Sequence, residues 1–370
     1  MTLPVVLALL AACTPPSADD KETSSAFDDV AAGTVTPAAT MMVDRAAHSA
    51  TLLADGRVLL VGGIRSGEVG LDTAELFDPA RGRFEPTGRL GSVRGGGQAV
   101  VRLRDGRVLV AGGWAEETVA RSAELYEPGI GEFRPTGSMT VPRADAAAAL
   151  LPDGRVLLAG GFDGTAALDT AEIYDPTSGR FTPTSRLSAA RSSVAAAGLD
   201  DGRVLLMGGQ GTTGDVLETA ETYDPATGEF SPTGSLRSVR YKAAAVPLVD
   251  GTVLVLGGSD ERDWHGQYDS AEIYDPDTGE FTPAADMNRT RFKIAAAVAS
   301  LADGRVLVGG SDPSVEIYDP RNGRFEITAG ELGAEYQFAT ATALLDGRAL
   351  ITGGYDAAIR PTANAWIYQP

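Results

Sequence analysis

The string DGRVLLVGG stands at residues 55–63 and recurs along the chain. Close copies occupy residues 105–113, 153–161, 201–209 and 303–310, and weaker copies occupy 250–258 and 346–354. Each copy ends in Gly-Gly, and these pairs begin at residues 62, 112, 160, 208, 257, 309 and 353. A period of about 50 residues is typical of propellers and other repeat architectures, in which each unit packs against its neighbours.

Four short apolar runs, separated by turn residues, make up each unit. In the first unit they read HSATLL, RVLLVGG, TAELFDP and RFEPTG. Asp55-Gly56 favours a tight hairpin between the first two runs, because glycine adopts positive φ without steric cost. The third run ends in Asp-Pro-x-x-Gly, as in DPATGEF at 224–230, which is a turn signal. Four antiparallel strands in a unit of this length form a propeller blade. The sequence therefore predicts an all-β, seven-bladed β-propeller over residues 33–370.

These residues resemble the kelch repeat family, and the resemblance spans residues 33–370. The matching features are the Gly-Gly doublet, the string AExYDP at 171–176 and 271–276, and an arginine just before each new unit. The resemblance implies blades of four antiparallel strands. In this family the fourth strand usually has tryptophan, and this chain has phenylalanine there, which is a change of packing. The phenylalanines are Phe84, Phe133, Phe181, Phe230, Phe281 and Phe325.

The seventh unit ends after its third strand, at Tyr368, so its fourth strand must come from elsewhere. The N-terminal string GTVTPAATMMVDR at 33–45 aligns with GEFSPTGSLRSVR at 228–240. We therefore expect residues 33–39 to complete blade seven. This closure leaves no unpaired edge between the first and last blades.

The first 32 residues are expected to lie outside the propeller. Residues 1–13, MTLPVVLALLAAC, contain an apolar run too short to span a bilayer, which fits a secretory signal. The ending LAAC resembles a bacterial lipobox, which implies lipid modification of Cys13 and an anchor at the cell envelope, in the periplasm or at the outer membrane. The alternative is a plain signal peptide with an incidental cysteine. Residues 14–32 are polar and acidic and read as a disordered linker.

The charge and the scarcity of histidine and cysteine exclude several classes of function. The net charge of −19 disfavours nucleic acids and anionic membrane surfaces, so any membrane contact would run through Cys13. The sequence has two histidines, His48 and His265, and one cysteine, so we expect no metal cluster and no cofactor. Some kelch-type propellers are copper radical oxidases that need two Tyr, two His and a crosslinked Cys, and the lack of a second cysteine argues against that chemistry. We expect a monomer.

An arginine opens the first strand of units one to six, and a glutamate occupies the third strand of the same units. Unit seven has Gln337 and Trp366 instead. Because the unit without the arginine also lacks the glutamate, we expect each pair to meet in a partly buried ion pair. Six copies favour a structural role over a catalytic one. The expected pairs are Arg45–Glu75, Arg94–Glu124, Arg143–Glu172, Arg191–Glu221, Arg240–Glu272 and Arg291–Glu316.

Large residues gather in the loops of units five to seven. These loops join strand two to three and strand four to one, and they emerge on one face of a propeller. Aromatic rings beside cations on such a face are a reasonable recognition patch. The alternative is that the rings of Tyr241, Phe292 and Phe338 fill the central channel. The candidate ligand-binding residues are Tyr241, Lys242, Arg262, Trp264, His265, Phe292, Lys293 and Phe338, with Trp114 and Tyr355 as weaker candidates.

No single acid–base constellation stands out in the sequence, and this favours binding over catalysis. The leading hypothesis is a non-catalytic recognition module at the bacterial envelope, with a protein or glycan as its partner. Two alternatives remain. One is a carbohydrate-active enzyme similar to the kelch-like propellers that epimerise sialic acids, and the other is a structural envelope protein.

Overall fold

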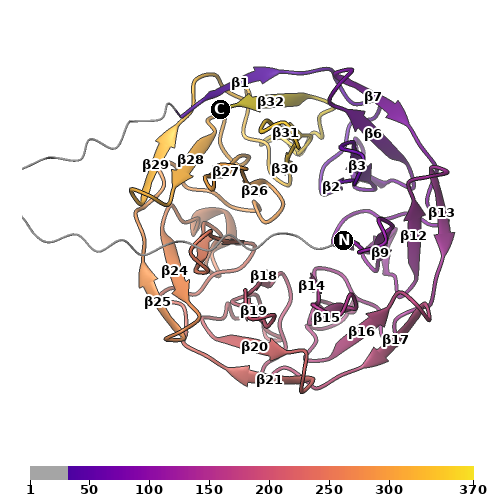
Figure 1. Cartoon of the computed structure of the whole chain (residues 1–370), viewed down its shortest axis with the longest axis vertical. Helices are drawn as coiled ribbons and strands as arrows, with labels where there is room; N and C mark the ends of the chain where they lie inside the picture. The colour runs from indigo at the N-terminus through magenta and orange to yellow at the C-terminus, as the bar shows by residue number, and fades with distance from the viewer. Residues whose placement is uncertain (1–31) are drawn as a thin grey trace, which may run out of the picture. The chain divides into compact units, whose positions relative to one another are not determined.

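Seven four-stranded antiparallel sheets stand around a central channel in the computed structural model, which describes residues 32–370 (Figure 1). This arrangement confirms the predicted seven-bladed β-propeller. No α-helix occurs within residues 32–370, where the one helical segment is the 3₁₀ turn η1 (Asp263–His265). No helix in this part of the chain is long and apolar enough to cross a membrane.

The blades follow one another along the chain, each with its strands in sequence order. Blade one consists of β2 (Ser49–Leu52), β3 (Val58–Val61), β6 (Ala74–Asp78) and β7 (Arg83–Pro86), and blade two of β8 (Ala99–Arg102), β9 (Val108–Ala111), β12 (Ala123–Glu127) and β13 (Glu132–Pro135). Blade three consists of β14 (Ala147–Leu150), β15 (Val156–Ala159), β16 (Ala171–Asp175) and β17 (Arg180–Pro183), and blade four of β18 (Ala195–Gly198), β19 (Val204–Met207), β20 (Ala220–Asp224) and β21 (Glu229–Pro232). Blade five consists of β22 (Ala244–Pro247), β23 (Val253–Leu256), β24 (Ala271–Asp275) and β25 (Glu280–Pro283), and blade six of β26 (Val298–Ser300), β27 (Val306–Val308), β28 (Glu316–Asp319) and β29 (Arg324–Ile327). Two small hairpins, β4 (Ile64–Arg65) with β5 (Val69–Gly70) and β10 (Trp114–Ala115) with β11 (Thr118–Val119), extend the connections after β3 and β9.

Blade seven joins the two ends of the propeller. It consists of β30 (Thr340–Ala343), β31 (Ala349–Thr352), β32 (Ala365–Gln369) and the N-terminal strand β1 (Thr34–Pro37). β1 pairs antiparallel with β32, with Val35 opposite Tyr368, and the two strands lie side by side in Figure 1. Val35 thus takes the place of the phenylalanine in the other blades, as the sequence alignment predicted.

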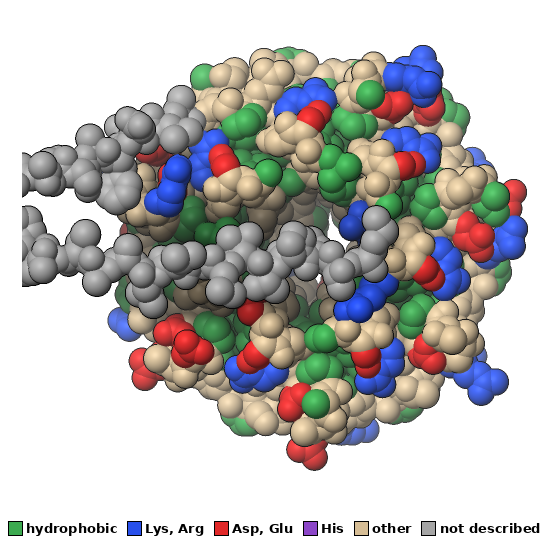
Figure 2. All heavy atoms as spheres, viewed as in Figure 1, with side chains coloured by type: hydrophobic (Ala, Val, Ile, Leu, Met, Phe, Trp, Pro, Cys, Tyr) green, Lys and Arg blue, Asp and Glu red, His purple; other side chains and the backbone are tan. Residues whose placement is uncertain are grey.

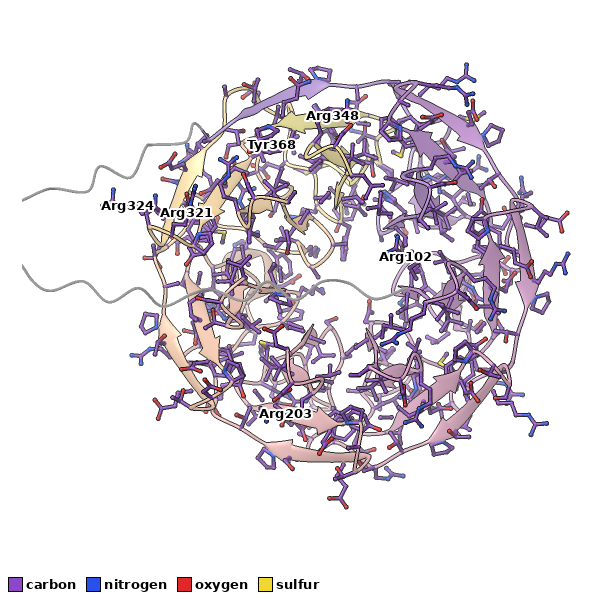
Figure 3. All side chains as sticks on the ribbon, viewed as in Figure 1. Arg102, Arg203, Arg321, Arg324, Arg348 and Tyr368 are labelled. Atoms are coloured by element: carbon purple, nitrogen blue, oxygen red, sulfur yellow. The ribbon has the colours of Figure 1, made fainter. Side chains whose placement is uncertain are left out.

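The first strand of each blade lies beside the channel, and the fourth lies at the outer edge. The first strands of neighbouring blades pack against one another around the ring. Figure 3 shows Arg102, on β8, near the channel, and Arg321 and Arg324 at the outer edge of blade six. On the face shown in Figure 2, acidic and basic side chains lie next to one another around the ring.

The core lies between blades, where the apolar faces of the sheets meet. The second strands, such as Val58–Val61 in blade one, are buried along their whole length because both of their faces are covered. An aromatic pair joins the third and fourth strands of blades one to six, as in Tyr174 and Phe181, whose ring centroids are 4.7 Å apart. The Tyr174 hydroxyl also shares a 2.8 Å hydrogen bond with Thr136 of the preceding blade, and the equivalent tyrosines of blades two, four and five make the same contact, which helps to fix the spacing of these blades.

The Gly-Gly pair lets one blade approach the next. Gly62 has a φ of 64°, and a β-carbon there would lie 2.6 Å from the carbonyl oxygen of Arg94 in blade two. The amide of Gly63 donates a 2.7 Å hydrogen bond to that same carbonyl. Only glycine tolerates both the backbone conformation and the contact.

Candidate functional site

Each arginine that opens a first strand contacts the glutamate of its own blade. Six such ion pairs occur, with N–O distances of 2.7–3.4 Å and both side chains almost completely buried. Arg143 also donates hydrogen bonds to the carbonyl oxygens of Gly160 and Thr170, and Glu172 accepts a hydrogen bond from the backbone amide of Thr140. Each pair therefore ties the start of a first strand to the second and third strands of the blade.

Blade seven replaces the ion pair with two aromatic rings. The backbone bridge Gln337–Tyr355 corresponds to Ala46–Ile64 in blade one, so Gln337 aligns with the residue after the arginine. The position of the arginine itself belongs to Tyr336, and the sequence alignment that placed Gln337 there was wrong by one residue. Tyr336 packs against Trp366, at the glutamate position, with ring centroids 5.2 Å apart.

A ring of residues faces the channel, each two residues after the opening arginine of its blade, or after Tyr336 in blade seven. These residues are Ala47, Gly96, Asp145, Ser193, Lys242, Lys293 and Phe338, and all seven line one cavity. All have positive φ, between 50° and 60° except at Gly96, which turns each side chain away from its strand. Amide-to-carbonyl hydrogen bonds link neighbouring positions, for example Ser193 to Asp145 at 3.0 Å and Lys242 to Ser193 at 3.2 Å. The backbone of this rim is therefore nearly constant from blade to blade, while the side chains vary.

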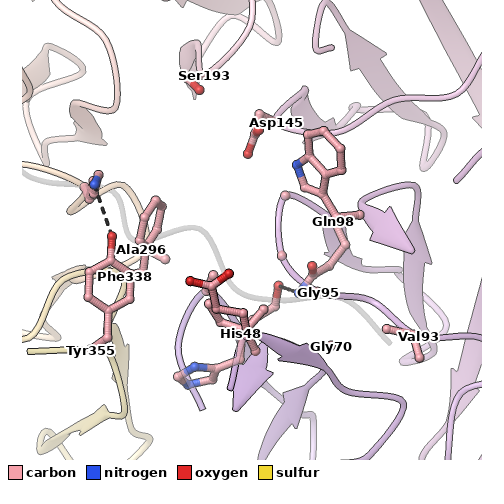
Figure 4. A pocket seen from close by; sticks show the side chains of 18 of the residues that line it. His48, Gly70, Val93, Gly95, Gln98, Asp145, Ser193, Ala296, Phe338 and Tyr355 are labelled. Carbon is pink, nitrogen blue, oxygen red and sulfur yellow. Dashed lines mark hydrogen bonds between the residues drawn. The ribbon is translucent and has the colours of Figure 1, made fainter. Parts of the chain in front are cut away.

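The cavity at the rim has a volume of about 1100 Å³. Its walls come from the connections between fourth and first strands and between second and third strands, which is the loop face that the sequence pointed to. Figure 4 shows Tyr355 and Phe338 on one side of it and Asp145 and Gln98 on the other. Trp114 and the acidic pair Glu116 and Glu117 also line it, from the hairpin after β9.

Two lysines on adjacent blades occupy one wall of this cavity. Lys242 and Lys293 are the only lysines among residues 32–370, although the chain has 31 Lys and Arg residues. Their ammonium groups both lie close to one aromatic ring, with Lys242 Nζ 5.2 Å and Lys293 Nζ 4.9 Å from the centroid of Phe292. Lys293 Nζ also donates a 3.1 Å hydrogen bond to the hydroxyl of Tyr355. Cation–π attraction stabilises ammonium groups held in this way.

The electrostatics of the lysine wall reflect burial and mutual repulsion. Burial and the charge of Lys242 lower the pKa of Lys293 to about 8, against the opposite effect of Asp263. Burial also lowers the pKa of Lys242, although Asp263 and Asp145 oppose this. Across the cavity, burial raises the pKa of Asp145, and Lys242 partly offsets the rise. Burial raises the pKa of Tyr355 to about 12, so its hydroxyl stays protonated at neutral pH.

Asp263, at the tip of the long blade-five loop, reaches toward the lysine wall. Its carboxylate accepts a hydrogen bond from the Tyr241 hydroxyl and lies 4.0 Å from Lys242 Nζ. Asp263 itself has a φ of 52°, a conformation that aspartate tolerates better than most residues. The loop therefore places a carboxylate of the protein beside one of the two ammonium groups.

The eight candidate ligand-binding residues do not form one surface. Lys242, Lys293 and Phe338 line the cavity, and they are joined there by Tyr355. Tyr241 and Phe292 are buried beneath them, where their rings contact each other with centroids 5.7 Å apart. The remaining three lie on the blade-five loop: Arg262 and His265 are exposed there, and the side chain of Trp264 lies outside the described residues.

The sequence reasoning missed Asp145, Ser193 and Asp263. Asp145 and Ser193 stand at the same distance from their arginines as Lys242 does from Arg240. Aligning the units on the arginine would therefore have found both residues. No comparable signal marks Asp263, because its place depends on the shape of a long loop.

The histidines lie apart and do not form a metal site. His48 is buried, and its Nε2 is 2.9 Å from the Thr352 hydroxyl, whereas His265 is exposed on the blade-five loop. Within residues 32–370 no three His, Cys, Asp or Glu side chains form a group that could hold a metal ion. The donors of a copper radical site, two Tyr and two His, are therefore not brought together in the described propeller. Cys13 lies outside the described residues.

Comparison with known proteins supports the fold and its repeat. The Kelch motif model matches residues 143–188 and 240–288, which cover blades three and five from their opening arginines onward. A fungal alcohol oxidase of the AA5 family, solved in complex with copper, is similar over 92% of this chain and 76% of its own, with 18% identity and a TM-score of 0.72. At that identity the likeness extends to the fold alone. No curated protein matches this chain. The chain is therefore a seven-bladed β-propeller with Kelch motifs matched in two of its blades.

Proposed function

We propose that this protein is a recognition module that binds an acidic glycan in the cavity at its channel mouth. The observation that supports this most directly is the convergence of Lys242 and Lys293 on one cavity wall, in a chain whose net charge is −19. A protein so acidic repels anions over most of its surface, so two adjacent ammonium groups at a concave site are a selective feature. A carboxylate placed beside them would relieve the repulsion between them.

The form of the cavity suits a sugar-sized ligand. Its volume of about 1100 Å³ is at the upper end of the range typical of small-molecule sites. Trp114 and Phe338 supply aromatic surface on which sugar rings can stack. Gln98, Ser193 and Asp145 supply hydrogen-bonding groups to the same cavity. A protein partner would instead contact the exposed loop tips, where Arg262 and His265 lie.

Calorimetric titration with glucuronate and with glucose tests the proposal, because the two sugars differ in one carboxylate. We expect glucuronate to bind and glucose to bind at least tenfold more weakly. Lys242→Met should lose most of the glucuronate affinity. Arg262→Ala removes an exposed cation of the same blade that does not line the cavity, and it should bind as the wild type does. Equal binding of the two sugars, no binding of glucuronate, or an equal loss in both variants would overturn the proposal.

We also propose that lipidated Cys13 holds the protein at the bacterial envelope. The support is the string LAAC at residues 10–13, which lies outside the described residues. Cys13→Ser, expressed in a bacterial host, should move the protein from the membrane fraction to the soluble fraction. A variant that stays with the membranes would contradict the anchor.

A further inference from the structure

The choice of lysine at the cavity contrasts with the rest of the propeller. The whole chain has three lysines, at positions 21, 242 and 293, and every other basic side chain except the two histidines is arginine. The six buried structural cations that open the blades are all arginines. Arginine stays protonated in proteins, whereas a buried lysine can lose its proton and act as a nucleophile. The only two lysines among residues 32–370 therefore line one and the same cavity.

Geometry presents the amine of Lys293 to the cavity. Its side chain is 8% exposed and lines the cavity wall, and the hydrogen bond to Tyr355 fixes its amino group. The rings of Phe292, Phe338 and Tyr355 lie 4.9, 5.4 and 5.7 Å from the amine. The ammonium group of Lys242 lies 5.2 Å from the centroid of the same Phe292 ring. A lysine that is desolvated by apolar walls and placed beside a second cation is the arrangement that activates amines in proteins.

We propose that Lys293 forms an imine with a ligand that has both a carbonyl and a carboxylate group, while Lys242 holds the carboxylate. This inference rests on the proposed function for the position of the carboxylate. The neutral amine attacks the carbonyl carbon, a C–N bond forms, and one amine proton passes to the carbonyl oxygen. The resulting hydroxyl leaves as water with a second proton, and a C=N bond remains. No oxidant or reductant takes part.

The surroundings of Lys293 favour the neutral amine that this step requires. Burial and Lys242 lower the pKa of Lys293 from 10.5 to about 8. At pH 7 that shift increases the neutral fraction by about 300-fold, because each pKa unit is a factor of ten. The imine, once protonated, has the same positive charge as the ammonium group that it replaces. Cation–π attraction from the three aromatic rings acts on the protonated imine as it does on the ammonium group, so forming the imine does not lose this attraction.

Reductive trapping tests the inference with the full chain. The protein is mixed at pH 7 with glyoxylate, which has an aldehyde and a carboxylate, in the presence of cyanoborohydride, and modified lysines are quantified by peptide mass spectrometry. Nα-acetyl-lysine in the same tube gives the rate of an ordinary amine. We expect Lys293 to be labelled at least tenfold faster than this reference, and faster by glyoxylate than by acetaldehyde. Lys293→Arg should abolish the fast labelling.

Two variants with opposite expected effects separate an activated amine from one that is merely accessible. Lys242→Met removes the neighbouring positive charge, raises the pKa of Lys293 and should slow its labelling at pH 7. Asp263→Asn removes the charge that raises the pKa of Lys293, so it should speed the labelling. The other titratable groups near this site, Tyr355 and Asp145, are unchanged in both. Equal melting temperatures would show that the two variants are folded.

The outcomes distinguish this inference from the proposed function. Labelling of Lys293 at the reference rate, or rates that do not change in Lys242→Met and Asp263→Asn, would overturn the imine. If glucuronate still binds the wild type in calorimetry in that case, the recognition proposal stands without the imine. If glucuronate does not bind but Lys293 is labelled rapidly by acetaldehyde and glyoxylate alike, the carboxylate site fails and with it the two-point attachment of the ligand.

Discussion

Replacing Arg143 with alanine should destabilise the propeller far more than replacing any exposed arginine. Arg143 is 1% exposed, and its guanidinium donates to the carbonyl oxygens of Gly160 and Thr170 at 2.9 and 2.8 Å and to Glu172 at 3.0 Å. In the alanine variant, Glu172 keeps one donor, the amide of Thr140, and remains a buried charge. Breaking one partner of a buried ion pair typically costs about 3–5 kcal/mol.

Urea denaturation followed by tryptophan fluorescence measures this loss, and blade three provides a matched control. Arg155 forms an ion pair with Asp153 in the same blade, but the two side chains are 42% and 46% exposed. Arg155→Ala should therefore cost less than about 1 kcal/mol. If Arg143→Ala unfolds at the same urea concentration as Arg155→Ala, the buried pairs do not stabilise the blades and the reasoning fails.

A double variant tests where the cost arises. Arg143→Met with Glu172→Met removes both charges and fills the space with apolar side chains, so no charge is left unpaired. Such replacements are often close to neutral. We expect the double variant to be more stable than Arg143→Ala, and blade seven shows why this is reasonable. There the same two positions hold Tyr336 and Trp366, which pack ring against ring in a folded blade.

Three further perturbations follow from the fold. Gly62→Ala should lower the free energy of unfolding by about 2 kcal/mol or more, because the new β-carbon would lie 2.6 Å from the carbonyl oxygen of Arg94. Gly82 has a similar φ but nothing within 4 Å of its β-carbon position, so Gly82→Ala should lower it by only about 1 kcal/mol in the same urea assay. Deleting residues 1–39 removes β1 and should lower the melting temperature and promote aggregation through the exposed edge of β32, whereas deleting residues 1–32 should leave the melting temperature unchanged. Burial holds the pKa of His48 well below 6.5. The neutral imidazole therefore stabilises the fold fully above about pH 6.5, and at lower pH the free energy of unfolding falls by up to about 1.4 kcal/mol per pH unit. Urea titrations at pH 4.5–7.5 should show this slope in the wild type and not in His48→Gln, and equal slopes would exclude His48 as its source.

The repeat made the fold predictable, because seven weak signals in one register amount to a strong one. The DGR turns, the Gly-Gly pairs and the arginines each recur at a constant place in the blade, so strand order and ring closure followed from alignment. The error at Gln337 arose in the unit that lacks the residues on which the other units were aligned. Blade seven has neither the arginine nor the glutamate, and nothing in the sequence fixes which residue replaces them.

The candidate site was less predictable, because it depends on the direction of individual side chains. Tyr241 and Lys242 are adjacent in the sequence, yet Tyr241 is buried and Lys242 lines the cavity. The cause is the positive φ of Lys242, which cannot be predicted from the sequence because lysine rarely adopts that conformation. The same change of direction buries Phe292 and turns Lys293 toward the channel. Because these aromatic residues and lysines are adjacent in the sequence, the sequence analysis placed them on one patch.

The rim of the channel shows how a repeated fold can make one site unique. In every blade, the second residue after the arginine, or after Tyr336 in blade seven, faces the channel in a left-handed conformation, which glycine would adopt with least strain. Only blade two has glycine there, at Gly96. The other six blades accept a strain of about 1 kcal/mol or more in order to place a side chain at that point. Packing does not require this, since the blade with glycine closes its part of the ring equally well. The proposed binding site makes use of this conformation at Lys242 and Lys293, because these two lysines of blades five and six are the pair whose chemistry differs most from the rest of the chain.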